Sequence, residues 1–136
     1  MQEEFGFSLV ELIFVVMIIG ILSLIGLPNA MKYMQETYKK ADLVNGTLLA
    51  ESMLQAVADG HKIKETQEGY QEVNALGVII DRNQNPVPLN LYISTIPTPK
   101  QKGYTHFVYR YTSSGALFIF KVHTDNSMVQ VYPMTT

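Results

Sequence analysis

The stretch that decides the fold is EEFGFSLVELIFVVMIIGILSLIGLPNA, residues 3–30 of the 136-residue chain. Between Phe7 and Leu27 it contains a single ionisable residue, Glu11. As a helix with a rise of about 1.5 Å per residue, this run spans roughly 30 Å, the thickness of the hydrocarbon core of a membrane. A carboxylate in such a helix is costly unless it has a partner or a function. The run therefore predicts a membrane-spanning helix, and Glu11 is its candidate functional residue.

The composition narrows the class of protein. The formal net charge is −2. A negative chain is not suited to bind the phosphate backbone of nucleic acids electrostatically, so this is not expected to be its main role. The chain has no cysteine, so it can form neither disulfides nor thiolate metal sites. We find no nucleophile elbow and no glycine-rich phosphate loop. The sequence thus predicts a protein that is not an enzyme, with no cofactor and no metal.

The residues before the apolar run do not match a cleaved secretory signal. Such a signal has a basic start, a short apolar core and a small-residue cleavage site. Here the start reads Gln2, Glu3 and Glu4, and the segment after the run is interrupted by Pro28. We expect the helix to be retained.

The Gly6–Phe7 junction offers an explanation for Glu11. A cut there would create an α-amino group four residues before the carboxylate, within one helix turn. Amine and carboxylate would then pair within one chain, or between copies whose helices are axially staggered. One cut would supply the missing counter-ion.

These residues together resemble the N-terminus of type IV pilins and of type II secretion pseudopilins. The resemblance combines Gly6 before Phe7, Ser8, Glu11, Gly20 and an apolar run that ends at Pro28. It covers about a fifth of the chain. In that family a prepilin peptidase cuts after the glycine and methylates the new N-terminal amine.

Carried over to this chain, the resemblance implies a cleaved leader (1–6), N-methyl-Phe7, and Glu11 as the residue that sets axial register during assembly. It also implies a single-pass protein held by its helix (7–31) in inner-membrane lipid. A membrane assembly platform would then polymerise it into an extracellular helical filament of identical subunits. Filaments of this kind serve adhesion, motility or DNA uptake.

Beyond Pro28 the helix is expected to become amphipathic and to continue to about residue 59, within a globular head (32–136). Apolar residues recur at spacings of three and four. The stripe expected to pack on the head consists of Val44, Leu48 and Glu51, flanked by Leu43, Thr47, Ala50, Leu54 and Val57. Asp59–Gly60 predicts the stop, since glycine readily adopts the left-handed conformation that ends helices.

Within the helix, the segment from Gly20 to Pro28 is the expected place for bending or local melting. Gly20 and Gly26 weaken a helix, and Pro28 cannot donate a hydrogen bond to the carbonyl four residues earlier. The family resemblance implies that this segment loses helicity when subunits pack into a filament.

The second half of the chain predicts a connection (60–103) with one strand, followed by an antiparallel β-sheet (104–136). YTHFVYRYT, ALFIFKVH and MVQVYP are rich in aromatic and β-branched residues, and SSG and DNS separate them as hairpin turns. Three or four strands packed on the amphipathic helix give an α+β fold. The resemblance implies the ladle-shaped fold of pilins, with the long helix as its handle.

Three other patterns are weaker candidates for chemistry. His106 and His123 are expected to face each other across a hairpin, without enough further ligands for a metal. DRNQN (81–85) opens like a calcium loop, but Pro86 stands where that loop needs glycine, so a turn is expected. KQKGYTHFVYRY (100–111) mixes basic and aromatic residues as single-stranded DNA-binding surfaces do. A half-buried sheet face explains the same pattern better.

Two alternatives to a pilus subunit stay open. The first is a pseudopilin of a type II secretion system. The second is a signal-anchored extracytoplasmic binding domain that never polymerises, although such an anchor requires neither the glycine–phenylalanine junction nor Glu11.

Overall fold

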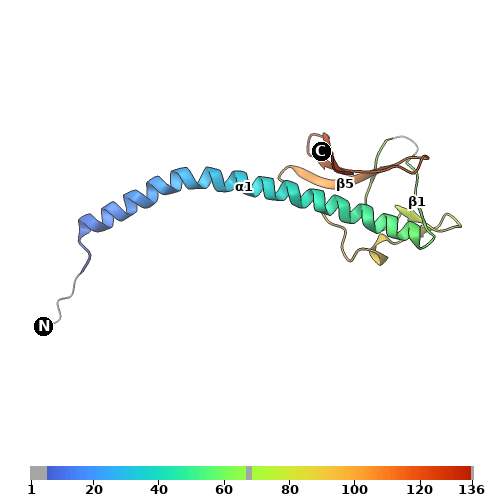
Figure 1. Ribbon diagram of the computed structural model, residues 1–136, viewed down its shortest axis with the longest axis horizontal. Helices are drawn as coiled ribbons and strands as arrows, with labels where there is room; N and C mark the ends of the chain where they lie inside the picture. Colours follow the sequence, from blue (N-terminus) through green and yellow to red (C-terminus); the bar gives the residue numbers. More distant parts are fainter. Residues whose placement is uncertain (1–5, 67–68, 136) are drawn as a thin grey trace. The chain divides into compact units, whose positions relative to one another are not determined.

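The structure, a computed structural model, describes residues 6–66 and 69–135. Of the expected leader, residues 1–5 lie outside the described residues. The chain forms two compact units, Met1–Glu36 and Thr37–Thr136. One helix, α1 (Leu9–Ala58), accounts for the described helical residues of the first unit and continues into the second, as the unbroken coil in Figure 1 shows.

The second unit adds two antiparallel sheets to the C-terminal part of α1. Its further elements are β1 (Lys62–Ile63), β2 (Gln71–Glu72), β3 (Ile79–Ile80), β4 (Pro86–Val87), the 3₁₀ helix η1 (Leu89–Leu91), β5 (Tyr104–Tyr111), β6 (Leu117–His123) and β7 (Met128–Tyr132). The larger sheet has the order β2-β5-β6-β7, and the smaller one has the order β1-β3-β4. The α+β fold, with a helix packed on an antiparallel sheet of four strands, is confirmed.

Helix α1 ends where the sequence predicts. Gly60 adopts a φ of 96°, in the left-handed region. The Gly60 N–H donates to the carbonyl of Val57, and the His61 N–H donates to the carbonyl of Ala56. This pair of bonds is the Schellman arrangement, which satisfies carbonyls that the end of a helix leaves without partners.

The connection from residue 60 to 103 contains more strand than expected. Among the described residues, β1, β2, β3 and β4 are each two residues long. Strands of this length leave no alternating pattern in a sequence, so the prediction of one strand was wrong. β2 supplies the fourth strand of the larger sheet, where Glu72 pairs with Val108.

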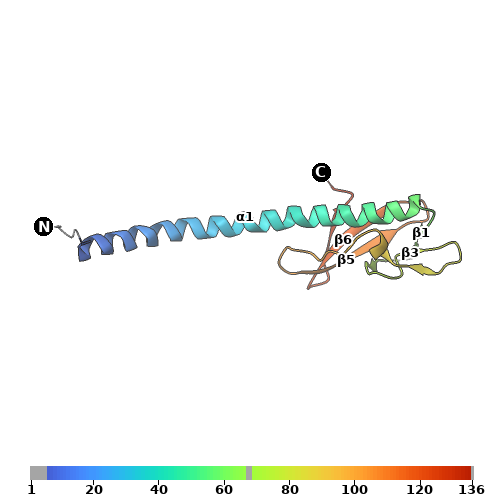
Figure 2. The ribbon, with the colours of Figure 1, turned by 90° about the horizontal axis from the view of Figure 1, so that it is seen from below.

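The core of the second unit lies between α1 and the sheets, and Figure 2 shows β5 and β6 along one side of the helix. Leu49 and Met53 of α1 are fully buried, as are Tyr109 of β5, Ile119 of β6 and Val131 of β7. The Tyr109 hydroxyl donates to the carbonyl of Lys64 and to Gln71 Oε1. Burial raises the pKa of Tyr109 to about 12, so its hydroxyl stays protonated at neutral pH.

The stripe of α1 that packs on the sheet differs from the predicted one. The buried residues of the helix are Asp42, Gly46, Leu49, Ala50, Ser52, Met53 and Ala56. Of the predicted stripe, Ala50 is buried, whereas Val44, Leu48, Leu54 and Val57 are between 40% and 56% exposed. Small residues permit a close approach: a Cβ on Gly46 would lie 2.5 Å from Cγ2 of Val131. Leu43 packs against the core, whereas Val44, Leu48 and Glu51, the centre of the predicted stripe, lie on the opposite, exposed side of the helix.

A buried ion pair joins α1 to the larger sheet. Nζ of Lys121 in β6 lies 2.9 Å from Oδ2 of Asp42, and the two side chains are 2% and 0% exposed. The backbone N–H groups of Lys100 and Gln101 also donate to the Asp42 carboxylate. Lys121 Nζ donates in addition to Gln101 Oε1 and lies 4.2 Å from the centre of the Tyr104 ring. Each of the two buried charges is therefore balanced by the opposite charge and by hydrogen bonds, which buried charges require because water does not reach them.

Candidate functional site

The N-terminal end of α1 is a capping box built around Glu11. The Ser8 N–H donates to Glu11 Oε2 over 2.9 Å, and the Glu11 N–H donates to Ser8 Oγ over 3.2 Å. Each side chain thus satisfies a backbone donor of the first turn. The helix begins at Leu9, two residues later than expected, because Ser8 acts as its cap. The S-x-x-E spacing of Ser8 and Glu11 is a known signal for this motif, although the sequence-based predictions did not include it.

The expected cleavage site lies next to this capping box. Gly6 is exposed, and a Cβ built on it would meet no atom within 4 Å. The side chain of Phe7 is 91% exposed. The Glu11 carboxylate contacts the N–H of the residue that follows Phe7. The structure therefore places three sequence-predicted residues, Gly6, Phe7 and Glu11, at one exposed helix end.

The apolar segment that follows is exposed to solvent along the described part of the first unit. All described residues from 6 to 36 are exposed, although the segment is rich in Leu, Ile, Val, Phe and Met. It is long and apolar enough to span a membrane. So large an exposed apolar surface requires lipid or protein around it.

The segment expected to bend is helical throughout. α1 runs through Gly20, Gly26 and Pro28 without interruption. Just before the proline, Ser23 Oγ donates to the carbonyl of Ile19, and just after it Asn29 Nδ2 donates to the carbonyl of Ile25. Neither bond reaches the carbonyl of Leu24, which Pro28 leaves without its usual N–H donor. Loss of helicity on assembly stays a prediction.

The second unit contributes a further apolar surface, here called the exposed stripe, which consists of Val44 and Leu48, one helix turn apart. Both residues lie on the C-terminal part of α1, on the side opposite the buried residues that contact the sheet. The exposed stripe shares one helix with the apolar segment. A helix that keeps apolar residues on a second face is suited to contact another protein.

The histidines do not form the arrangement expected across the hairpin. His123 pairs with Tyr104, and His106 pairs with Val122, with an irregularity in the ladder between them. His123 Nδ1 instead lies 3.0 Å from Asp125 Oδ1 in the turn before β7. Hydrogen bonds from Ser127 and the contact with His123 lower the pKa of Asp125 to about 2. Within residues 6–66 and 69–135, no three His, Cys, Asp or Glu side chains lie together as metal ligands.

DRNQN forms the expected turn. Oδ1 of Asp81 accepts hydrogen bonds from the N–H groups of Asn83 and Asn85, both over 2.8 Å. The bonds from Asn85 lower the pKa of Asp81. Gln84 in this turn has a φ of 66°. The carboxylate that would serve a calcium ion is occupied by the backbone of its own loop.

The aromatic residues of the basic strand point mainly into the core. Phe107 and Tyr109 are 2% and 0% exposed, and Tyr111 packs against the core. They cannot offer a free row of rings on which bases would stack. Arg110 alternates with them and is exposed. The interpretation as a half-buried sheet face is confirmed for these residues.

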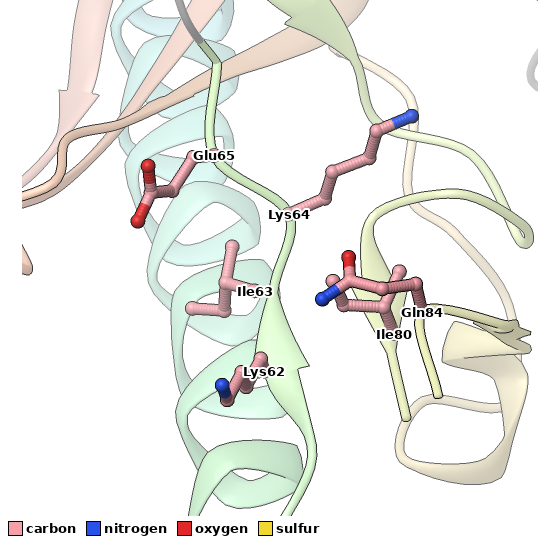
Figure 3. Close-up of a pocket in the computed structure, with 6 residues that line it drawn as sticks. All are labelled: Lys62, Ile63, Lys64, Glu65, Ile80 and Gln84. Atoms are coloured by element: carbon pink, nitrogen blue, oxygen red, sulfur yellow. The ribbon is translucent and has the colours of Figure 1, made fainter. Parts of the chain in front are cut away.

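A cavity of about 390 Å³ lies beside β1. Its lining residues are Lys62, Ile63, Lys64, Glu65, Ile80 and Gln84, and Figure 3 shows Lys64 and Glu65 pointing to opposite sides of the chain. None of the six is a serine, cysteine or histidine, and the charged residues Lys62, Lys64 and Glu65 form no ion pair with one another. The cavity gives no basis for assigning a reaction.

No protein-family model and no solved structure matches this chain. The exposed apolar segment with a carboxylate at its end is the candidate site of the first unit, and the exposed stripe is a separate apolar surface of the second unit.

Proposed function

We propose that this chain is the structural subunit of a type IV pilus. The prepilin peptidase cleaves it after Gly6 and methylates the amine of Phe7, and the mature subunit polymerises through α1. The single observation that carries the proposal is the position of the Glu11 carboxylate, 2.9 Å from the Ser8 N–H at the tip of an exposed apolar helix. A new amine on Phe7 would be one residue away from that N–H.

The chemistry of the helix supports assembly as well as membrane anchoring. Before assembly, lipid covers the apolar segment and the subunit is a single-pass membrane protein. After extraction, copies of the same helix replace the lipid, because apolar surface of this extent is not stable in water. Repeated contacts that do not close on themselves generate a helical filament. In the filament core, Glu11 opposite a Phe7 amine sets the axial register, since an unpaired carboxylate there is strongly unfavourable.

The exposed stripe has a defined role in this proposal. Val44 and Leu48 keep the C-terminal part of α1 apolar on the side away from the sheet. That surface packs on the apolar segments of neighbouring subunits. The head then stays folded on one side of the helix while the other side joins the filament core.

We expect Leu48→Glu to abolish filaments while the head folds normally. Leu48 is 46% exposed, so the charge causes little harm in the monomer but is buried without a partner in the filament. The assay is electron microscopy and sedimentation of sheared filaments from cells that contain the processing and assembly machinery. Leu91→Glu is the matched control, because Leu91 lies in η1 and is 69% exposed. This variant should assemble normally.

Two results would contradict the proposal. The first is a wild-type chain that accumulates in the membrane but yields no filaments beside a functioning assembly system. The second is normal filaments from Leu48→Glu. The first result would favour the alternative of a membrane-anchored head that never polymerises.

A further inference from the structure

The larger sheet has a second face, turned away from α1, which the proposed function does not use. The face toward the helix carries Phe107, Tyr109 and Ile119, which belong to the core, and Lys121, which contacts Asp42. Side chains alternate between the faces of a strand, so the intervening residues lie on the other side. This outer face consists of Tyr70, Val108, Phe118, Phe120, Val122 and Met128, with His106, Arg110, Glu72 and Gln130 around them.

The outer face is an organised apolar surface. Val108 pairs with Phe120, and Val122 pairs with Met128. The ring of Tyr70 meets that of Phe120 edge-on, with centroids 5.0 Å apart. Val108 and Val122 are 7% exposed but lie outside the core cluster, whereas Tyr70 and Met128 are each 43% exposed. Aromatic residues and methionine gathered in this way, with polar residues around them, are typical of a protein–protein contact.

Two opposite charges lie side by side on this surface. Glu72 pairs with Val108, and Arg110 stands two residues along β5 from Val108, opposite Phe118. Glu72 and Arg110 are therefore diagonal neighbours on the same face. Both are exposed, and neither forms an ion pair with any residue in the described part of the chain. Each is available to an opposite charge on a partner.

We propose that the outer face binds the outer face of a second copy of this chain, in a two-fold contact. A two-fold interface brings residue i of one copy opposite residue j of the other, and j opposite i. With Arg110 facing the second copy's Glu72, both charge pairs form at once around the apolar residues. A surface that carries its own complementary charges fits a copy of itself better than a uniformly charged partner.

The expected contact is weak by itself. The outer face is only part of one small sheet, and interfaces of limited area belong to transient contacts. Chains held in one membrane, or heads repeated along filaments, raise its effective concentration. The proposal holds whether or not the subunits polymerise, so it does not depend on the proposed function.

The test uses the full chain in lipid nanodiscs, one copy in each, without processing or assembly machinery. The bilayer covers the apolar segment, so association between discs reports on the heads. Sedimentation velocity should show concentration-dependent pairing of wild-type discs at or below about 1 mM protein, weakened by salt. Arg110→Glu and Glu72→Arg should each weaken pairing by about tenfold or more, since like charges then face each other.

Mixing the two variants is the decisive arm. Discs with Arg110→Glu carry two acidic residues at these positions and discs with Glu72→Arg carry two basic ones, so a 1:1 mixture should pair again. Arg82→Glu and Glu65→Arg make the same charge changes at exposed positions outside the outer face and should pair like the wild type. The proposal is overturned if wild-type discs stay single. This holds even if the outer face is found to bind a different protein. Single variants that pair normally, or a mixture that does not recover, overturn it as well.

Discussion

Glu11→Gln is expected to fail in filament assembly as completely as Glu11→Ala, with both proteins still inserted in the membrane. Glutamine can replace glutamate in a capping box, so the bond from the Ser8 N–H survives in Glu11→Gln. Its side chain cannot form an ion pair with the amine of Phe7. The two variants therefore separate the local role of Glu11 at the helix end from its proposed role between subunits.

The measurement is the amount of sheared filament relative to membrane-bound subunit for each variant. Ser8→Ala is the matched control, because it removes the Oγ that accepts the Glu11 N–H and leaves the carboxylate in place. Loss of a cap costs about 1 kcal/mol of helix stability, which membrane insertion readily tolerates. Ser8→Ala should assemble. Normal filaments from Glu11→Gln would remove the ionic register role and leave Glu11 as a cap.

Lys121→Met is expected to destabilise the second unit by about 3 to 5 kcal/mol, since it leaves the Asp42 carboxylate buried without its cation. For a unit of this size, such a loss lowers the melting temperature by more than about 10 °C. Asp42→Leu should be similarly harmful, because it strands the Lys121 ammonium and removes the acceptor for two backbone N–H groups. Urea unfolding of the chain in detergent micelles, followed by tyrosine fluorescence, measures both.

The double variant Asp42→Leu/Lys121→Met completes a mutant cycle. Its loss should be clearly smaller than the sum of the single losses, because neither charge then remains buried alone. Lys102→Met is the matched control, since Lys102 is exposed and lies in the same loop as Lys100 and Gln101. Additive losses, or a harmless Lys121→Met, would show that the ion pair does not hold α1 on the sheet.

Long regular elements were predictable from the sequence for simple reasons. The unbroken apolar run from Leu12 to Leu27 is long enough to predict a helix, and Asp59–Gly60 marks the end of that helix with the residue that a left-handed cap requires. β5, β6 and β7 also show clearly, because each is a run of aromatic and β-branched residues between turn formers.

The packing of α1 on the sheet was not predictable, because both sides of the helix look apolar. The contact uses Gly46 and other small residues, which allow the sheet to approach, and it includes Asp42, which appears as an ordinary surface residue in the sequence. Its partner Lys121 lies 79 positions away. Nothing local to either residue indicates that the two charges are buried together.

Of the candidate site, the sequence predicted the residues but not their arrangement. Gly6, Phe7 and Glu11 follow from their spacing. The bonds between Ser8 and Glu11 show that the carboxylate already has a local role at the helix end. The exposed stripe emerged only from the structure, because its residues had been assigned to the core.

Mass spectrometry of the N-terminal peptide shows whether this chain enters the pilin pathway, as we propose. The chain is purified from cells that express it together with its own processing enzyme. We expect a mature chain that lacks Met1 to Gly6 and begins at Phe7 with one added methyl group on the amine. A chain that still begins at Met1 in the presence of the active peptidase would contradict this proposal, and Glu11 would then have no amine to pair with.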